Sequence, residues 1–110
     1  MGAWDVKSEG LDQALDTLVV ALCYGFFARD EAIKEKRCTR RTLMEYEYIN
    51  QRLESAVREI VGDDYQIYIS EIGNKVGYAK SELYDVGETK YKKLKKEVKI
   101  NVAKRLHLID

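Results

Sequence analysis

Apolar residues recur at steps of three and four along most of this 110-residue chain, the spacing that places side chains on one face of a helix. In the N-terminal third this spacing is kept by Leu11, Leu15, Leu18, Leu22 and Phe26. It predicts a helix over residues 11–36. Between residues 19 and 27 the segment is apolar nearly all round, and such a helix has to be covered on several sides. A second copy of the chain is one source of cover, so homodimerisation through this helix is a hypothesis.

A second helix is predicted from Thr42 to about residue 61. Thr42 and Glu45 have the spacing of a capping box, in which a hydroxyl and a carboxylate satisfy free amides at the helix start. Gly62 follows as the expected stop. The apolar stripe between these signals consists of Leu43, Tyr46, Ile49, Leu53, Val57 and Ile60. The two predicted helices form a hairpin over residues 11–61, and this hairpin carries the hypothetical dimer contact.

The link between the two predicted helices, KEKRCTRR at residues 34–41, is basic. It has two interpretations. It is either a clamp for phosphate groups or the cation enrichment that is usual at a helix C-terminus. We favour the second interpretation slightly.

Residues 63–72 carry two competing patterns. The alternation at residues 65, 67 and 69 fits a strand, whereas Tyr65, Tyr68 and Ile72 fit one face of a helix. A helix is the better prediction because a lone strand would have no pairing partner elsewhere in the sequence. A turn at residues 73–77 and a short helix over residues 79–86 are expected to follow.

The most regular pattern belongs to residues 87–108, which predict one long helix with two faces. Its apolar stripe consists of Tyr91, Leu94, Val98 and Val102. Its opposite face carries Thr89, Lys92, Lys93 and Lys96. Gly87 stands where an N-cap is expected, and the Glu88 carboxylate suits the positive end of the helix dipole.

These elements predict an all-α protein that forms a single domain over residues 1–110. A helical hairpin is followed, at residues 63–109, by a helix-turn-helix part with a long basic last helix. The absence of proline suits long helices. The longest apolar run, residues 18–28, is too short to span a bilayer, and the two cysteines lack metal-ligand spacing. We therefore expect a cytoplasmic protein with reduced thiols and no membrane association.

Charge is unevenly distributed although the chain is neutral overall. Residues 87–110 contain eight basic and three acidic residues, a net charge of +5, and residues 1–86 carry the compensating −5. Such asymmetry favours an anionic partner for the basic end, most often nucleic acid. The competing interpretation is a solvated lysine face that keeps a small protein soluble.

A short helix, a turn at a glycine and a longer basic helix are the outline of a helix-turn-helix. In that motif the first helix braces the second, whose N-terminal turns lie in the major groove of double-stranded DNA. Side chains there reach base edges and phosphates. The candidate DNA-binding residues are Lys80, Ser81, Thr89, Lys90, Lys92, Lys93 and Lys96.

Three stretches carry a pattern beyond the helical spacing: RTLMEYEYIN at residues 41–50, YISEIGNKVGYAKSELY at residues 68–84 and GETKYKKLKKEVKINVAKRLHLI at residues 87–109. Through these stretches, residues from about 39 to 109 resemble transcriptional regulators of the ArpU type (autolysin regulatory proteins) of phages and prophages. The family has a Thr-x-Tyr-x-x-x-Lys run and a closing Ala-x-x-Leu. Thr89, Tyr91, Lys95, Ala103 and Leu106 match these positions.

The resemblance implies a helix-turn-helix related to region 4 of sigma factors, DNA binding and control of late genes. It leaves open whether RNA polymerase is a partner. One departure is Gly87, where a Ser or Thr cap is usual in the family. A glycine cap is expected to cost a few tenths of a kcal/mol and to remove a hydroxyl that could contact phosphate.

Catalytic and cofactor chemistry find little support in the sequence. His107 is the only histidine, so neither a catalytic triad nor a zinc cluster can be built on it. We expect no enzyme activity and no cofactor. The alternative to a DNA-binding regulator is a structural or adaptor protein of phage origin, which would oligomerise through its N-terminal helix and bind an acidic protein through its basic helix.

Overall fold

The computed structural model describes residues 11–109, apart from the side chain of Tyr84, and this part of the chain is helical with no strand. The predicted all-α class is confirmed. Residues 1–10 and 110 of the predicted single domain lie outside the described part. The α-helices are α1 (Gln13–Tyr24), α2 (Phe26–Glu35), α3 (Arg40–Val61), α4 (Tyr65–Gly73) and α5 (Glu88–Arg105). Single-turn 3-10 helices are η2 (Gly62–Asp64), η3 (Tyr78–Lys80) and η4 (Tyr84–Val86).

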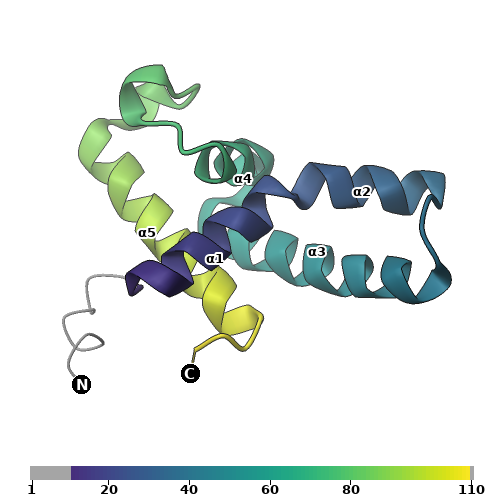
Figure 1. Ribbon diagram of the computed structural model, residues 1–110. Helices are drawn as coiled ribbons and strands as arrows, with labels where there is room; N and C mark the ends of the chain where they lie inside the picture. The colour runs from purple at the N-terminus through teal and green to yellow at the C-terminus, as the bar shows by residue number, and fades with distance from the viewer. Residues whose placement is uncertain (1–10, 110) are drawn as a thin grey trace.

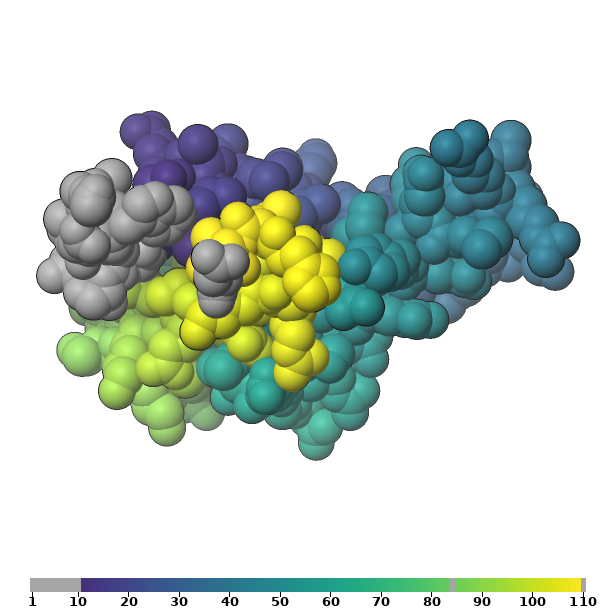
Figure 2. Space-filling view, turned by 90° about the horizontal axis from the view of Figure 1, so that it is seen from below, coloured from purple at the N-terminus to yellow at the C-terminus, as the bar shows by residue number. Residues whose placement is uncertain are grey.

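The helices form a body and an arm (Figure 1). The body contains α1, α4, α5 and the C-terminal half of α3, and the arm consists of α2 packed antiparallel on the N-terminal half of α3. Seen from below, the arm stands clear of the body (Figure 2). The largest fully buried side chains all belong to the body and come from α1, α3, α4 and α5: Val19, Cys23, Leu53, Val57, Tyr68, Ile69, Ile72, Tyr91, Val98 and Val102.

The predicted hairpin is present, but its first helix is bent into two. Gly25 ends α1 and serves as the N-cap of α2. Its backbone stays in the right-handed helical region, at φ −83° and ψ −3°, but its ψ departs from the value of a regular α-helix. Arg29 and Asn50 hold the bend. The Arg29 Nε donates to Asn50 Oδ1 at 2.7 Å, and the Asn50 amide donates to the Phe26 carbonyl at 3.0 Å. As a result α1 packs in the body while α2 leaves it with α3.

The start of α3 differs from the predicted capping box. Thr39, not Thr42, is the N-cap, and its hydroxyl accepts from the Thr42 amide at 3.3 Å. Glu45 does not reach back to the helix start but lies 4.0 Å from the guanidinium of Arg41. The helix therefore begins at Arg40, and Gly62 ends it at a positive φ of 66°, as expected of a stop signal.

The ambiguous segment is helical, as predicted, and its last residue, Gly73, packs closely against the end of α1. A Cβ at Gly73, at the end of α4, would lie 2.6 Å from both the amide nitrogen and the Cα of Tyr24. Only a glycine lets the ends of α4 and α1 meet at this distance. This contact sets how α4 lies against α1.

The segment at residues 79–86 does not form the expected short α-helix. It contains two single 3-10 turns, η3 and η4, with Ser81 in an extended conformation between them. The amides after Ser81 bond to side chains and not to helix carbonyls: Glu82 donates to Glu71 at 2.8 Å and Leu83 donates to the Ser81 hydroxyl at 2.8 Å. The α-helix that precedes the long basic helix is therefore α4, and residues 74–87 connect the two.

Candidate nucleic-acid interface

The apolar stripe of α5 fixes which way its cationic face points. Tyr91, Val98 and Val102 are fully buried in the core, as the helical spacing predicted. At the C-terminal end the Asn101 amide donates to the Ala56 carbonyl of α3 at 2.8 Å. Arg105 adds bonds to Ser55 at 2.8 Å and Glu59 at 2.6 Å. With one side held along its length, the opposite side of α5 faces outward.

The N-terminal turns of α5 are held by a buried carboxylate on α4. Glu71 is only 5% exposed and accepts three hydrogen bonds. One of its oxygens accepts from the Tyr91 hydroxyl at 2.7 Å and the Ser81 hydroxyl at 2.6 Å, and the other accepts from the Glu82 amide. One side chain thereby joins α4, the connecting segment and α5, which gives α5 the brace that a recognition helix requires.

Lys95 completes this cluster from the flank of α5. Its ammonium donates to the Val76 carbonyl at 2.8 Å and lies 4.9 Å from the centre of the Tyr91 ring. Burial lowers the pKa of Lys95, with the charge of Lys99 acting in the same direction. Lys95 therefore holds the connecting segment and does not face outward with the exposed lysines of α5.

The ionisation of this cluster favours a charged Glu71 and a neutral Tyr91. Burial acts to raise the pKa of Glu71, but the hydrogen bonds from Ser81, the Glu82 amide and Tyr91 outweigh it, so the pKa lies below its ordinary value. Burial and the bond to Glu71 raise the pKa of Tyr91 to about 12. At neutral pH the tyrosine is therefore a donor and the carboxylate an acceptor.

Five of the seven candidate DNA-binding residues lie together on the outward face of α5. Thr89, Lys90, Lys92, Lys93 and Lys96 are all exposed. A shallow hollow on this face is lined by Glu88, Thr89, Lys92, Lys93 and Lys96.

The lysines of this face differ in their pairing. Lys92 forms an ion pair with Glu88 one turn earlier at 2.8 Å. Lys90, Lys93 and Lys96 have no ion pair with any residue that the structure describes. Their charges are thus available to an anionic ligand.

The remaining two candidates lie on the connecting segment, and one of them is corrected by the structure. Lys80 is exposed in η3 and, with Lys75, lines a separate hollow on the connecting segment. Ser81 is buried, donates to Glu71 and accepts from the Leu83 amide. Its hydroxyl is therefore committed to the fold and cannot contact DNA in this arrangement.

Sequence reasoning missed Lys75 as a member of the basic surface, and it missed Glu71 as the support of the site. Lys75 stands in the predicted turn and has a positive φ of 56°, which turns the chain after α4. Glu71 lies in a stretch with helical spacing, where a carboxylate is expected to be solvated. A Ser ten residues later and a Tyr twenty residues later were the only signals of its partners.

The basic segment at residues 34–41 is partly neutralised within the chain: Lys34, Arg37 and Arg41 form ion pairs, whereas Lys36 and Arg40 form none with any described residue. Arg37 lies 2.6 Å from Glu35 and 3.6 Å from Glu31. Lys34 lies 3.1 Å from Asp30, and Arg41 lies near Glu45. This pairing lowers the positive potential at the tip of the arm and favours the interpretation as a helix end over that of a phosphate clamp.

Other chemistry is weakly represented in residues 11–109. This part of the chain contains no cluster of three or more His, Cys, Asp or Glu side chains that could hold a metal ion. The Cys23 thiol is 1% exposed, and burial raises its pKa to about 12, which makes it a poor nucleophile. None of the helices described is both long enough and apolar enough to cross a membrane.

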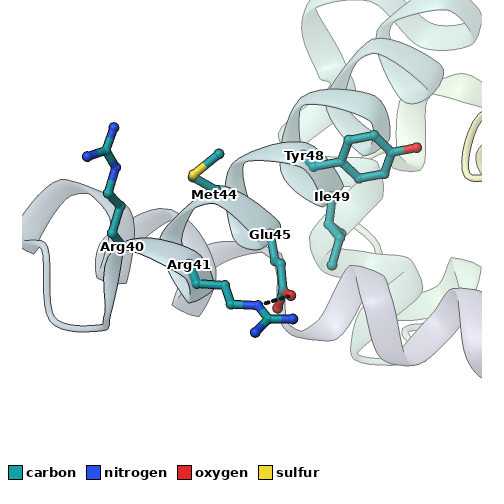
Figure 3. Close-up of a pocket in the computed structure, with 6 residues that line it drawn as sticks. All are labelled: Arg40, Arg41, Met44, Glu45, Tyr48 and Ile49. Atoms are coloured by element: carbon teal, nitrogen blue, oxygen red, sulfur yellow. Dashed lines mark ion pairs between the residues drawn. The ribbon is translucent and has the colours of Figure 1, made fainter.

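A further hollow lies on the outer face of α3 and not near α5. Figure 3 shows that its lining comes from α3 alone, with Arg40, Arg41, Met44, Glu45, Tyr48 and Ile49. Met44 is 60% exposed there, and charged side chains alternate with apolar ones. This surface holds no pair of groups suited to acid–base chemistry, because its one carboxylate is paired with Arg41.

No protein family, curated protein or solved structure matches the chain. The candidate interface therefore rests on the geometry and the charge of the chain itself.

Proposed function

We propose that this protein binds double-stranded DNA through the cationic face of α5. The observation that carries the proposal is the row of exposed lysines Lys90, Lys93 and Lys96, which have no ion pair with the described residues and lie on a helix held rigidly from behind. A protein gains affinity for DNA by neutralising phosphates and releasing their counterions. Three lysine ammonium groups within two turns of α5, unpaired among the described residues, could neutralise phosphates in this way.

The geometry of the supported helix favours DNA over other anionic partners. An α-helix fits the major groove, and the first turns of α5 present Thr89 with the lysines around it. Hydroxyl and ammonium groups contact both phosphates and base edges. Lys75 and Lys80, on the connecting segment, would extend the contact to the neighbouring phosphates.

The proposal extends to a regulator of transcription that reads a particular DNA sequence in a phage or prophage. This second step rests on the resemblance of residues 39–109 to ArpU-type regulators and not on the charge of α5. RNA polymerase is a candidate partner on the same ground. An acidic protein partner is the competing use of the same lysine face, and the experiment below separates the two.

The test is the anisotropy of a labelled random-sequence duplex titrated with the full chain at several salt concentrations. We expect micromolar binding, and a slope of log K against log salt of about −3 to −6, as four to six phosphate contacts require. Replacing Lys90, Lys93 and Lys96 with Gln is expected to make that slope shallower by about three. Replacing Glu88 with Gln is expected to tighten binding, because it removes a negative charge and releases Lys92.

The matched control is a second triple variant in which Lys34, Arg40 and Arg41 are replaced with Gln. It removes the same number of charges from the tip of the arm, so it should keep the wild-type salt slope. Loss of binding in this variant alone would move the site to residues 34–41. No binding of the wild-type chain at low salt would overturn the DNA proposal in favour of an acidic protein partner.

A further inference from the structure

An uncharged seam runs along the outer side of α1. Its residues are all exposed and fall on one face of the helix: Ala14, Thr17, Leu18, Ala21 and Tyr24. Tyr24 is 69% exposed and Leu18 is 41% exposed, and both belong to the few large apolar side chains that are exposed in the described structure. Charged residues make up 35% of the whole chain, so three helical turns without one are unusual for a surface that faces water.

The packing of α1 inside the chain does not account for this seam. The opposite side of the helix supplies Val19, Val20 and Cys23 to the core and packs against α4. The rest of the described chain therefore covers this apolar helix on one side only, although its sequence predicts cover on several sides. The seam continues onto the first turn of α2, where Phe27 is 42% exposed and Ala28 is also exposed.

We propose that the seam of α1 is the interface between two copies of this chain, packed antiparallel about a twofold axis at Ala21. The order of side-chain sizes is symmetric about that residue. In an antiparallel pair, residues at equal distances on either side of the axis face each other, so Leu18 meets Tyr24 of the second copy. Small residues lie at the axis and beyond the large ones, which lets the two helices approach closely.

This self-complementary order singles out a second copy as the occupant. In an isologous interface the same surface of each copy must fit itself after a rotation of 180°. The seam meets this condition, because Leu18 faces Tyr24 of the second copy and Ala21 faces its own copy. The hollow on α3 in Figure 3 fits this role less well, because Arg41 and Glu45 stand among its apolar residues. The dimer does not depend on DNA binding, but if both hold, one dimer presents two α5 faces, as helix-turn-helix dimers do.

Sedimentation equilibrium of the full chain tests the interface. We expect a dimer at micromolar concentration. Ala21→Arg places two like charges at the axis and should raise the dimer Kd about 100-fold or more. Gln51→Arg is the matched control, because it introduces the same side chain at an exposed helical position on α3 and should leave the Kd unchanged.

Cross-linking fixes the axis. In a Cys38→Ser background, Ala21→Cys is expected to form an intermolecular disulfide under mild oxidation, because residues at a twofold axis face their own copies. Gln51→Cys should stay reduced. Circular dichroism of each variant shows that it is folded.

Three outcomes would overturn the proposal. The first is a wild-type chain that remains monomeric at a concentration of about 100 μM. The second is a dimer that Ala21→Arg leaves intact. The third is a dimer that Met44→Arg, on the α3 hollow, disrupts in place of Ala21→Arg. None of these outcomes bears on the DNA titration, so the two proposals fail separately.

Discussion

The hydroxyl of Tyr91, in the first turns of α5, lies 2.7 Å from a carboxylate oxygen of Glu71 near the end of α4. Both side chains are buried, and the same oxygen accepts from Ser81 on the segment between the two helices. The bond therefore closes a loop of about twenty residues around one charge. It holds in place the turns of α5 that carry the exposed lysines of the proposed DNA-binding face.

Removing either partner of this bond is expected to destabilise the protein. Tyr91→Phe should lower the free energy of unfolding by about 1.5–3 kcal/mol, since the bond involves a charged acceptor. Glu71→Gln should lower it at least as much, because it removes the charge and replaces one acceptor oxygen with an NH2 group that faces a donor. Urea unfolding of both single variants and the double variant measures the coupling between them. Additive losses would show that the bond contributes nothing in solution.

The lowered pKa of Glu71 predicts a loss of stability in acid. The folded pKa lies below the ordinary value of 4.5, so the contribution of Glu71 is present above pH 4.5 and is lost as the pH falls through the folded pKa. The difference in unfolding free energy between wild type and Glu71→Gln should therefore shrink below about pH 4.5. Glu59→Gln is the comparison for Glu71→Gln, because the pKa of Glu59 is also lowered, by Asn101 and Arg105, but at an exposed site. A difference that is constant from pH 7 to pH 3 would contradict the prediction.

Local patterns predicted most of the fold because most helices bury a stripe of regular spacing. The stripes of α3 and α5 place Leu53, Val57, Val98 and Val102 in the core, as their spacing required. Gly25 marked a candidate kink in the first predicted helix, but the sequence alone did not show that Arg29 meets Asn50 across the hairpin and holds a bend there. The start of α3 was placed three residues too late, because Thr39 and Thr42 both suit an N-cap and only Thr39 serves as one.

The site was predictable where it depended on helical geometry and not where it depended on distant partners. The 100° turn of an α-helix was enough to place Lys92, Lys93 and Lys96 opposite Tyr91. The burial of Ser81 depends on its hydrogen bond to Glu71, which lies ten residues earlier on α4. No periodic pattern in the sequence contains that information. The same bonds explain why residues 79–86 form 3-10 turns and not the short helix.

The close approach at Gly73 predicts a large effect from a single methyl group. A Cβ there would lie 2.6 Å from backbone atoms of Tyr24, which cannot move without displacing the end of α1. Gly73→Ala should lower the free energy of unfolding by about 3 kcal/mol or more. Gly77→Ala is the matched control, because no atom lies within 4 Å of its Cβ and its φ of −86° suits any residue. Thermal unfolding followed by circular dichroism compares them, and equal stability of the two variants would contradict the close packing of α4 on α1.

Gly87→Ser is a substitution for which N-cap preferences and the observed backbone predict opposite changes in the free energy of unfolding. Residue preferences alone give Gly87→Ser a gain of a few tenths of a kcal/mol, because serine is the better N-cap. However, Gly87 has a φ of 95° with a ψ of 142°, a conformation that residues with a Cβ rarely adopt. The backbone therefore predicts a loss of about 1–3 kcal/mol in urea unfolding.

The control for this test is Gly77→Ser, at a glycine with an ordinary negative φ, which should change stability by less than about 0.5 kcal/mol. A loss confined to Gly87→Ser would show that the turn into α5 needs a glycine, so the departure from the Ser or Thr cap follows from the path of the connecting segment. A gain would mean that the turn can relax to an ordinary cap. In that case the N-terminal turns of α5, which carry Thr89 and Lys90, would be held by Tyr91 and Glu71 and not by the backbone at residue 87.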